Sequence, residues 1–287
     1  MNLCDPKTIK EIMSIFGLSF RKEFGQNFLT DQSVVASIAD ACDGASTVLE
    51  IGAGCGSLTH ELALRYDRVI ALEIDKGLIP LLRYTLEAHK NVELHQADVT
   101  KTDLAALLGD TFAAGPVSVC ANLPYYITTP ILLQLLESGL PFDCITLMIQ
   151  KEVADRLCAR PGDSDYGSVT AYLSYFGECE KLFHVPAAKF LPPPKVDSTV
   201  VRIRLYKEKP VKPQDEQLFF RVIRAAFGQR RKTLQNALAT GIGELPKAEI
   251  AETIQACGFA ADIRGERMSC ADFAKISDAL GERIRNA

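Results

Sequence analysis

Short apolar runs alternate with amphipathic stretches over the first half of the chain. Apolar runs bounded by turn residues are typical of buried strands, whereas apolar residues three and four apart indicate helices. The runs predict strands over residues 47–51, 68–74, 92–95, 117–121 and 144–149. The helical spacing predicts helices over residues 33–41, 57–65, 76–88, 103–108, 130–138 and 150–158. This alternation indicates an α/β fold with a parallel, doubly wound sheet.

A polar segment divides the chain near residue 206. Residues 206–213 include two prolines and few apolar residues, a composition typical of a linker. Before it, residues 168–176 and 198–205 are predicted as further strands and are expected to form an antiparallel edge hairpin. After it, the apolar spacing predicts helices near residues 215–227, 230–239, 247–256 and 270–284. Because 287 residues exceed a usual single domain, we expect an α/β domain at 1–206 and a small all-helical domain at 207–287.

A glycine-rich turn follows the first predicted strand. It reads Gly52-Ala53-Gly54-Cys55-Gly56, and its glycines allow the backbone to bend tightly and to approach a ligand closely. The spacing G-x-G-x-G differs from the dinucleotide fingerprint G-x-G-x-x-G, which places a pyrophosphate at a helix N-terminus. The difference favours a ligand without a pyrophosphate, such as S-adenosylmethionine, and leaves a nicotinamide or flavin site as the alternative.

Two acidic residues lie where the next strands end. Glu73 comes about 20 residues after the glycines, the position at which doubly wound folds bind ribose hydroxyls. Asp98 follows the third strand, and its carboxylate suits the amino group of an adenine ring. Either acid alone could be a helix cap or a solvated charge. Their shared position favours ligand contacts, because ligands bind at the carboxyl ends of parallel strands.

The segment after the fourth predicted strand carries a candidate catalytic site. Asn122 offers an amide oxygen, Pro124 a carbonyl and Tyr125 an aromatic face. Together these groups could grip an exocyclic amine, since two acceptors on the hydrogens of adenine N6 would pull that nitrogen towards a tetrahedral, nucleophilic geometry. The alternative is an ordinary strand-to-loop turn, because asparagine and proline are common in such turns.

Several motifs along most of the chain resemble those of one family and occur in the same order. They are Phe24–Leu29, the glycine turn, Asn122–Tyr125, Gln150–Leu157, Phe190–Ser198, Arg224–Phe227 and Gln229–Leu234. The family is that of the small-subunit ribosomal RNA adenine dimethyltransferases of the KsgA type. The resemblance implies a Rossmann-like class I methyltransferase fold with S-adenosylmethionine as cofactor. It also implies dimethylation of N6 on two adjacent adenines near the 3′ end of 16S rRNA.

The resemblance implies a role for each matching residue. The cofactor would be bound by Asn27, Leu29, Gly52, Gly54, Glu73, Asp98 and Asn122. Asn122 would serve both substrates, since its side chain and the Pro124 carbonyl would also orient the target N6. Tyr125 and Phe190 would stack on the flipped base, although either aromatic residue could instead belong to the core.

The charge balance bears on an RNA partner in two opposite ways. The formal net charge of −4 argues against attraction of nucleic acid to the whole surface. Residues 218–243 nevertheless contain no acid, and their five basic residues are predicted to bind RNA: Arg221, Arg224, Arg230, Arg231 and Lys232. Apolar residues among them have helical spacing, so the alternative is a solvated helix face. The expected partner is a small ribosomal subunit precursor with its 16S rRNA.

The remaining composition indicates a cytoplasmic chain without a metal. Its nine cysteines form no C-x-x-C pair and are odd in number, which is typical of reduced core thiols in a cytosolic protein. The four histidines show no metal-ligand spacing with them. No leader sequence and no apolar run long enough to span a membrane is apparent. No long heptad pattern is apparent either, so we expect a monomer.

Other functions remain open beside the small-subunit dimethyltransferase. The macrolide-resistance methyltransferases of 23S rRNA share segments like Asn122–Tyr125, but usually lack the runs Pro192–Ser198 and Gln229–Leu234 in these forms. A DNA adenine methyltransferase would more often carry an acid at position 122. A nicotinamide-dependent oxidoreductase is disfavoured by the glycine spacing. A non-catalytic binder of ribosomal precursors would keep the cofactor fold, and this role can coexist with catalysis.

Overall fold

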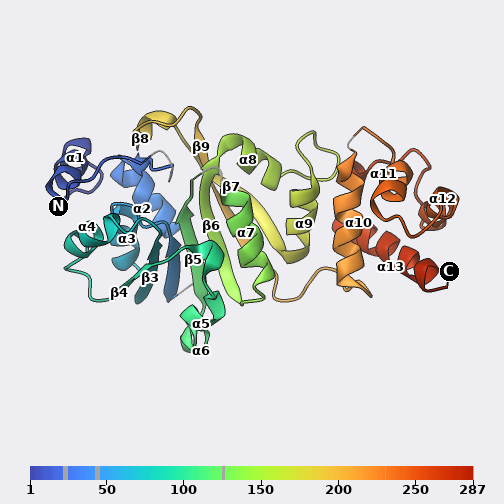
Figure 1. The fold of residues 1–287 in the computed structure, drawn as a ribbon, viewed down its shortest axis with the longest axis horizontal. Coiled ribbons are helices and arrows are strands. Elements are labelled where there is room, and N and C mark those ends of the chain that lie inside the picture. The colour runs from blue at the N-terminus through green and yellow to red at the C-terminus, as the bar shows by residue number, and fades with distance from the viewer. Residues whose placement is uncertain (22–24, 43–45, 125–126, 230, 287) are drawn as a thin grey trace. The chain divides into compact units, whose positions relative to one another are not determined.

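A seven-stranded sheet forms the centre of the first of two units in the chain (Figure 1). The computed structural model describes residues 1–21, 25–42, 46–124, 127–229 and 231–286. The first unit comprises Met1–Ala154 and Cys179–Leu205, and the second comprises Asp155–Glu178 and Tyr206–Ala287. Residues 155–178, which were expected in the α/β domain, therefore group with the C-terminal helices.

The strand order of this sheet is β4-β3-β2-β5-β6-β9-β7. The strands are β2 (Thr47–Ile51), β3 (Arg68–Glu73), β4 (Val92–Gln96), β5 (Val117–Asn122), β6 (Phe142–Gln150), β7 (Gly177–Val185) and β9 (Ser198–Leu205). The neighbours from β4 to β6 pair in parallel, whereas β9 pairs with β6 antiparallel. Strands β2, β3 and β5 are almost wholly buried, as parallel strands covered on both faces are. The expected doubly wound sheet is confirmed.

Helices pack against this sheet through two apolar clusters. The helices are α1 (Pro6–Ile15), α2 (Gln32–Asp40), α3 (Ser57–Ala63), α4 (Leu78–Thr85), α5 (Leu104–Leu108), α6 (Thr111–Ala114) and α7 (Thr128–Glu137). Ile38 of α2 and Leu62 of α3 belong to a cluster with Val69. Leu81 of α4 belongs to another with Ala71. Helix α8 (Lys151–Leu157) contains the first boundary between the two units.

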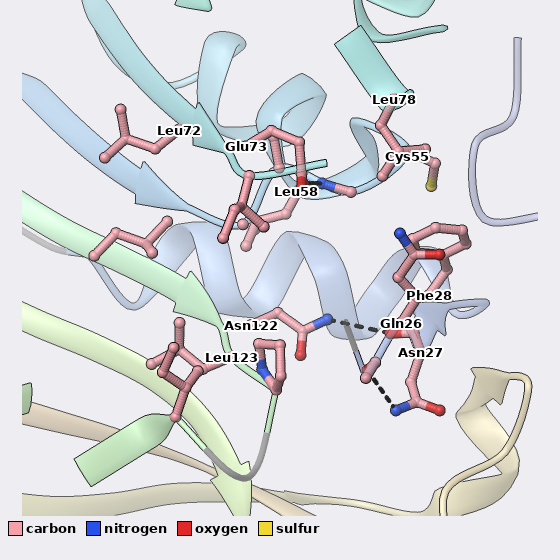
Figure 2. A pocket seen from close by; sticks show the side chains of 18 of the residues that line it. Gln26, Asn27, Phe28, Cys55, Leu58, Leu72, Glu73, Leu78, Asn122 and Leu123 are labelled. Atoms are coloured by element: carbon pink, nitrogen blue, oxygen red, sulfur yellow. Dashed lines mark hydrogen bonds between the residues drawn. The ribbon is translucent and has the colours of Figure 1, made fainter. Parts of the chain in front are cut away.

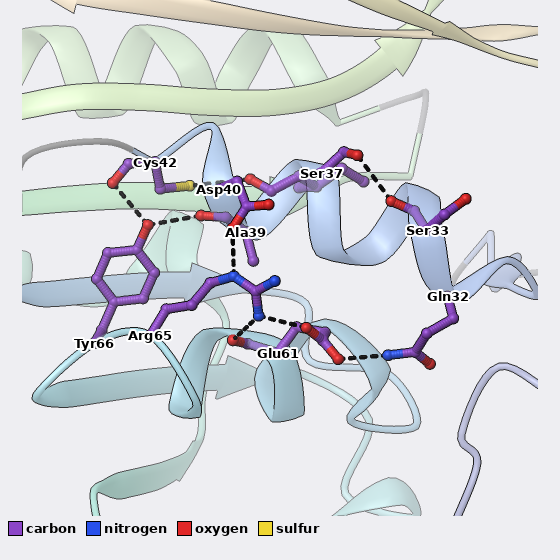
Figure 3. A network of polar contacts seen from close by, with 10 residues as sticks. Gln32, Ser33, Ser37, Ala39, Asp40, Cys42, Glu61, Arg65 and Tyr66 are labelled. Atoms are coloured by element: carbon purple, nitrogen blue, oxygen red, sulfur yellow. Dashed lines mark hydrogen bonds and ion pairs between the residues drawn. The ribbon is translucent and has the colours of Figure 1, made fainter.

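A polar network fastens α2 to α3 (Figure 3). Glu61 of α3 accepts hydrogen bonds from the Gln32 side chain of α2 and from the Arg65 guanidinium. Arg65 also donates from Nε to Asp40 Oδ1 at 2.5 Å. The Tyr66 hydroxyl donates to two backbone carbonyl groups at the C-terminal end of α2, at 2.6 and 2.9 Å. The two helices are therefore tied together at both ends of α2.

A second, two-stranded sheet joins two distant parts of the first unit. Strand β1 (Phe28–Leu29) pairs antiparallel with β8 (Phe190–Leu191), with Leu29 opposite Phe190. Strands of two residues show no periodicity, so this pairing was not expected from the sequence. It brings the N-terminal segment beside the segment that carries Phe190.

The second unit is helical. Its helices are α9 (Ser168–Phe176), α10 (Glu216–Gly228), α11 (Leu234–Gly241), α12 (Lys247–Ala256) and α13 (Cys270–Asn286). Phe219 of α10 and Phe273 of α13 are fully buried. The Tyr166 hydroxyl, also buried, donates to the Met268 carbonyl at 2.9 Å. The four helices expected near 215–284 are confirmed, and α9 is added to them.

The expected strand at residues 168–176 is wrong, because this segment is helix α9. Its β-branched and aromatic residues suggested a strand, but tertiary packing decides the outcome. Tyr172 lies 4.5 Å from Phe220 between ring centroids, and Tyr175 lies 5.3 Å from Phe219. Residues three apart share a helix face but lie on opposite faces of a strand, so only a helix lets both rings meet α10. The strand beside β9 is instead β7.

Candidate functional site

A pocket of the first unit lies at the carboxyl ends of β2, β3 and β5 (Figure 2). It collects every residue predicted to bind the cofactor: Asn27, Leu29, Gly52, Gly54, Glu73, Asp98 and Asn122. Pro124 and Phe190, predicted to hold the target base, line the same pocket. Tyr125 lies outside the described residues. The pocket therefore unites the two groups of residues that the sequence predicted separately.

The glycine turn forms the floor of this pocket and needs its glycines. Gly52 and Gly54 have φ angles of +83° and +60°, a left-handed conformation that other residues rarely adopt. A Cβ on Gly54 would lie 3.1 Å from Cε1 of Phe28, which is tighter than ordinary packing. The backbone can therefore lie directly against Phe28 and face a ligand without a side chain in between.

Glu73 ties this turn to the end of β3. Its carboxylate accepts hydrogen bonds from the N–H groups of Gly54 and Asp75, both at 2.8 Å. The residue is 5% exposed, and burial raises its pKa above the ordinary range. Each carboxylate oxygen has a further lone pair. Glu73 can therefore accept a hydroxyl hydrogen from a ligand while it holds the turn in place.

Glu50 of β2 lies beneath the glycine turn and was not predicted as a site residue. It is 1% exposed, and burial raises its pKa to about 8. Within the part of the chain that is described, neither of its carboxylate oxygens has a hydrogen-bond partner. Burial therefore favours the protonated form of Glu50, a buried polar group close in sequence to the glycines.

Asp98 is both a helix cap and a pocket residue. Its Oδ1 accepts hydrogen bonds from the Thr100 N–H at 3.0 Å and the Thr100 hydroxyl at 2.6 Å, and Lys101 lies 3.3 Å from Oδ2. These bonds, the Thr100 hydroxyl first, lower the pKa of Asp98. The carboxylate therefore stays ionised and can accept a hydrogen bond from an amino group.

Asn122 lies between the N-terminal segment and the end of β5. Its Nδ2 donates to the Asn27 carbonyl at 3.5 Å, and Figure 2 shows its side chain directed towards that segment. The Pro124 carbonyl accepts the Ile127 N–H at 3.1 Å and lies 3.5 Å from the Thr128 hydroxyl. Because the second of these contacts is long, one lone pair of the Pro124 oxygen can still serve a substrate amine.

Several lining residues had no assigned role in the sequence. Gln26 fastens the N-terminal segment, since its side chain donates to Asp75 at 3.0 Å and accepts from the Arg21 N–H at 2.9 Å. Ile74 is 42% exposed and presents an apolar surface beside Glu73. Both lie next to predicted residues, Gln26 within the motif at 24–29 and Ile74 directly after the acid. Their closeness in sequence to predicted residues is the feature that could have identified them as pocket residues.

The basic residues predicted to bind RNA belong to the second unit. Arg224, Arg231 and Lys232 are exposed. Arg221 is also exposed, but its guanidinium contacts both carboxylate oxygens of Glu244 at 2.8 Å. Glu244 lies just beyond the acid-free segment at 218–243, and its contact compensates the positive charge of Arg221. Arg230 lies outside the described residues.

The cysteines, the metal-binding side chains and the helix lengths were also the subject of predictions from the sequence. The nine cysteines all lie within the described residues and form no disulfide bond, and six of them are buried. In the described part of the chain, no group of three or more histidine, cysteine or acidic residues is placed to hold a metal ion. No helix among the described residues is long and apolar enough to cross a membrane.

Comparisons with known proteins agree with the motifs and the geometry. The family model of ribosomal RNA adenine dimethylase matches residues 17–278. The chain is 44% identical to the ribosomal RNA small subunit methyltransferase A of Geobacillus thermodenitrificans, over 97% of each chain. It is 42% identical to the enzyme of that name from Alkaliphilus oremlandii, over 98% of this chain and 99% of the relative.

Two solved structures resemble the chain over most of its length. One is a dimethyladenosine transferase from Plasmodium falciparum, with a TM-score of 0.73, 27% identity, and coverage of 87% of this chain and 95% of that one. The other is the 23S rRNA methyltransferase ErmE, with a TM-score of 0.69, 26% identity, and coverage of 89% and 100%. The fold is therefore shared by an enzyme named as a dimethyladenosine transferase and by one named for 23S rRNA.

Proposed function

Because the chain belongs to the ribosomal RNA adenine dimethylase family, we propose that it dimethylates N6 of two adjacent adenines near the 3′ end of 16S rRNA. The observation that carries the proposal is the pocket in which the glycine turn, Glu73 and Asp98 meet Asn122 and Phe190. A methyl donor and an acceptor amine must lie within one pocket for direct transfer. This family membership also makes the chain an rRNA methyltransferase.

The pocket residues fit S-adenosylmethionine. Gly52 and Gly54 carry no side chains of their own, so a ligand in the pocket can approach the backbone of the turn. Glu73 offers acceptors for ribose hydroxyls, Asp98 an acceptor for an adenine amine, and Ile74 an apolar surface for a flat ring. When bound, the cofactor supplies a methyl group on a positively charged sulfur, which is a good leaving group. The chain therefore needs no covalent nucleophile of its own.

The protein's contribution to the reaction is positioning and charge stabilisation. The Asn122 amide oxygen and the Pro124 carbonyl oxygen accept hydrogen bonds from the two hydrogens on N6. These bonds direct the nitrogen lone pair at the methyl group. Alignment of this kind can lower a barrier by roughly 7–11 kcal/mol. The nitrogen becomes positive as it attacks, and the same two oxygens stabilise that charge. Its proton then leaves to water.

The target base must leave its stack before it can react. Extrusion of a base costs a few kcal/mol, which stacking on an aromatic side chain offsets. Phe190 lines the pocket and is 5% exposed as a member of the apolar cluster that contains Leu29, so its ring would meet the base from within the pocket wall. Tyr125 would supply a second. This arrangement favours a base presented from single-stranded or opened RNA.

The basic residues of the second unit are proposed to contact the phosphates of the ribosomal particle. Arg224, Arg231 and Lys232 are exposed there. The proposed partner is a small ribosomal subunit precursor, with the enzyme acting as a cytoplasmic monomer that also assists assembly. A catalytically inactive Asn122 variant that still associates with immature subunits would support the assembly role.

The substrate is tested by methylation of defined particles. The protein is incubated with labelled S-adenosylmethionine and with unmethylated small subunits, large subunits or DNA, and the labelled nucleotide is mapped. We expect label in two adjacent adenines near the 3′ end of the small-subunit RNA. Label in large-subunit RNA alone would instead support a 23S rRNA methyltransferase, the activity named for the ErmE structure.

A further inference from the structure

Lys189 is anchored through both its backbone and its side chain. Its carbonyl accepts the Thr30 N–H at 2.8 Å, which extends the pairing of β1 with β8 by one bond. Its ammonium group lies 2.5 Å from Oδ2 of Asp31. The next residue is Phe190, a buried aromatic side chain that lines the pocket. The backbone that carries Phe190 is therefore fixed from the side of Asp31.

Asp31 is a firm anchor for this ion pair. Its other oxygen, Oδ1, caps helix α2 by accepting hydrogen bonds from the N–H groups of Ser33 and Val34 at 3.0 and 3.3 Å. The Lys189 ammonium is the largest cause that holds the pKa of Asp31 far below its ordinary value. Helix α2 is in turn fastened to α3 by the network in Figure 3.

The other end of the segment is also fixed. Asp197 accepts the Ala187 N–H at 2.8 Å through its side chain, and its carbonyl accepts the Lys151 N–H at 3.0 Å. The pairing of Leu29 with Phe190 then places a predicted cofactor contact opposite the base-stacking residue. The Lys189–Asp31 ion pair thus links the β8 segment, which carries Phe190, to the β1 segment, which carries Leu29.

We propose that Lys189 is a positioning residue that holds Phe190 in place, through Asp31, so that the same adenine can receive its second methyl group. This inference rests on the proposed function. Two methyl groups require two cofactor molecules, so the spent cofactor must leave between the transfers. The base receives both groups in one binding event only if it stays in the pocket meanwhile. A loosened Phe190 lets that base escape between the transfers.

The proposal predicts a change in products and not only a loss of rate. For Lys189→Met, we expect methyl transfer to slow about 10-fold and the ratio of N6-methyladenosine to N6,N6-dimethyladenosine to rise several-fold. Nucleosides from small subunits methylated under limiting enzyme are quantified by mass spectrometry. Cofactor affinity, measured by calorimetry, should change less than the transfer rate. Loss of folded protein would lower both products in proportion and leave their ratio unchanged.

Four further variants sharpen this experiment. Lys189→Arg keeps the charge and should restore the wild-type ratio. Asp31→Asn keeps an oxygen for the helix cap but removes the charge, so it should reproduce the Lys189→Met ratio, and the double variant should be no worse than either. Lys7→Met is the matched control, because Lys7 forms an exposed pair with Glu11 at 3.8 Å, away from the pocket lining.

The outcomes separate the two proposals. A wild-type product ratio in Lys189→Met or in Asp31→Asn overturns the positioning role, whatever happens to the total rate. A failure of Lys189→Arg to restore the ratio also overturns it. If the wild-type protein methylates no small-subunit adenine, the proposed function itself fails. Because a partly exposed ion pair contributes little to global stability, we expect all five variants to melt near the wild-type temperature.

Discussion

Asn122 serves both sides of the pocket with one amide group. Its nitrogen donates to the Asn27 carbonyl of the N-terminal segment, and the proposed function assigns its oxygen to the substrate amine. In that proposal, the same side chain contacts both the N-terminal segment and the target base. The two contacts use different atoms, so substitutions here should separate cofactor binding from transfer.

We predict that Asn122→Ala reduces methyl transfer at least about 100-fold, the usual cost of a lost group that stabilises transition-state charge. Cofactor affinity should weaken only in part, because the glycine turn, Glu73 and Asp98 remain. Transfer to small subunits and calorimetric binding of S-adenosylmethionine measure the two effects. Asn236→Ala, in the second unit, is the control. Near-normal turnover of Asn122→Ala would refute the assignment of Asn122.

Gly54 offers a second test at the scale of one residue. We predict that Gly54→Ala loses roughly 1–3 kcal/mol of unfolding free energy from its left-handed backbone, and also weakens cofactor binding as the new methyl group meets Phe28. Gly139→Ala is a matched control, because Gly139 has a φ of +67° and a Cβ added there would meet no atom within 4 Å. Urea unfolding and calorimetry should show a similar strain in both variants but a loss of binding only in Gly54→Ala.

At the scale of elements, β2 is a central strand in which all five residues are buried. The carboxyl group of Glu50 is therefore enclosed with the rest of the strand. Its pKa of about 8, against an ordinary 4.5, means that the folded chain keeps a proton that the unfolded chain releases between these values. Stability should consequently fall as pH rises through this window, by roughly 1 kcal/mol per pH unit, and level off above it.

We predict that Glu50→Gln removes this contribution, since an amide of similar shape does not titrate. The unfolding free energy of the variant minus that of the wild type should become more positive from pH 5 to pH 8. Urea unfolding at four pH values in this range measures the difference. A difference that does not depend on pH would contradict the burial of a proton at Glu50.

The elements show where sequence reasoning succeeds and where it stops. The buried strands and the acids at their ends were predictable, because parallel strands direct their carboxyl ends to one edge and Glu73 and Asp98 lie there. The sequence predicts a strand where helix α9 lies, because β-branched and aromatic residues favour strands. The aromatic residues of α9 instead pack against α10, and the local sequence carries no information about that contact. Strand β1 is too short to show a period. The Lys189–Asp31 pair depends on that pairing, so it was not predictable either.

At the scale of the whole molecule, a negative chain must approach a negative particle. The formal net charge is −4, yet Arg224, Arg231 and Lys232 are exposed within a segment without acids. Arg221 is less available, because Glu244 compensates it. Attraction should therefore be local, and it should depend on salt through the few phosphates that these residues neutralise.

We predict that substituting Arg224, Arg231 and Lys232 by alanine together weakens binding to small subunits. The slope of log affinity against log salt is negative, and its magnitude should decrease by about 2, as expected for three lost phosphate contacts. Cosedimentation at a series of potassium chloride concentrations measures the slope. Arg221→Ala should change it less. An unchanged slope in the triple variant would remove this surface from the RNA-binding site.

The pairing of β1 with β8 has a consequence for how the enzyme is made. Asp31 and Lys189 lie 158 positions apart, and one wall of the pocket comes from each end of that interval. Translation delivers the N-terminal wall early and its partner only after most of the chain has been synthesised. The pocket therefore cannot be complete on a nascent chain that ends before Phe190, so the wall proposed to meet the target base is added after every predicted cofactor residue has been synthesised.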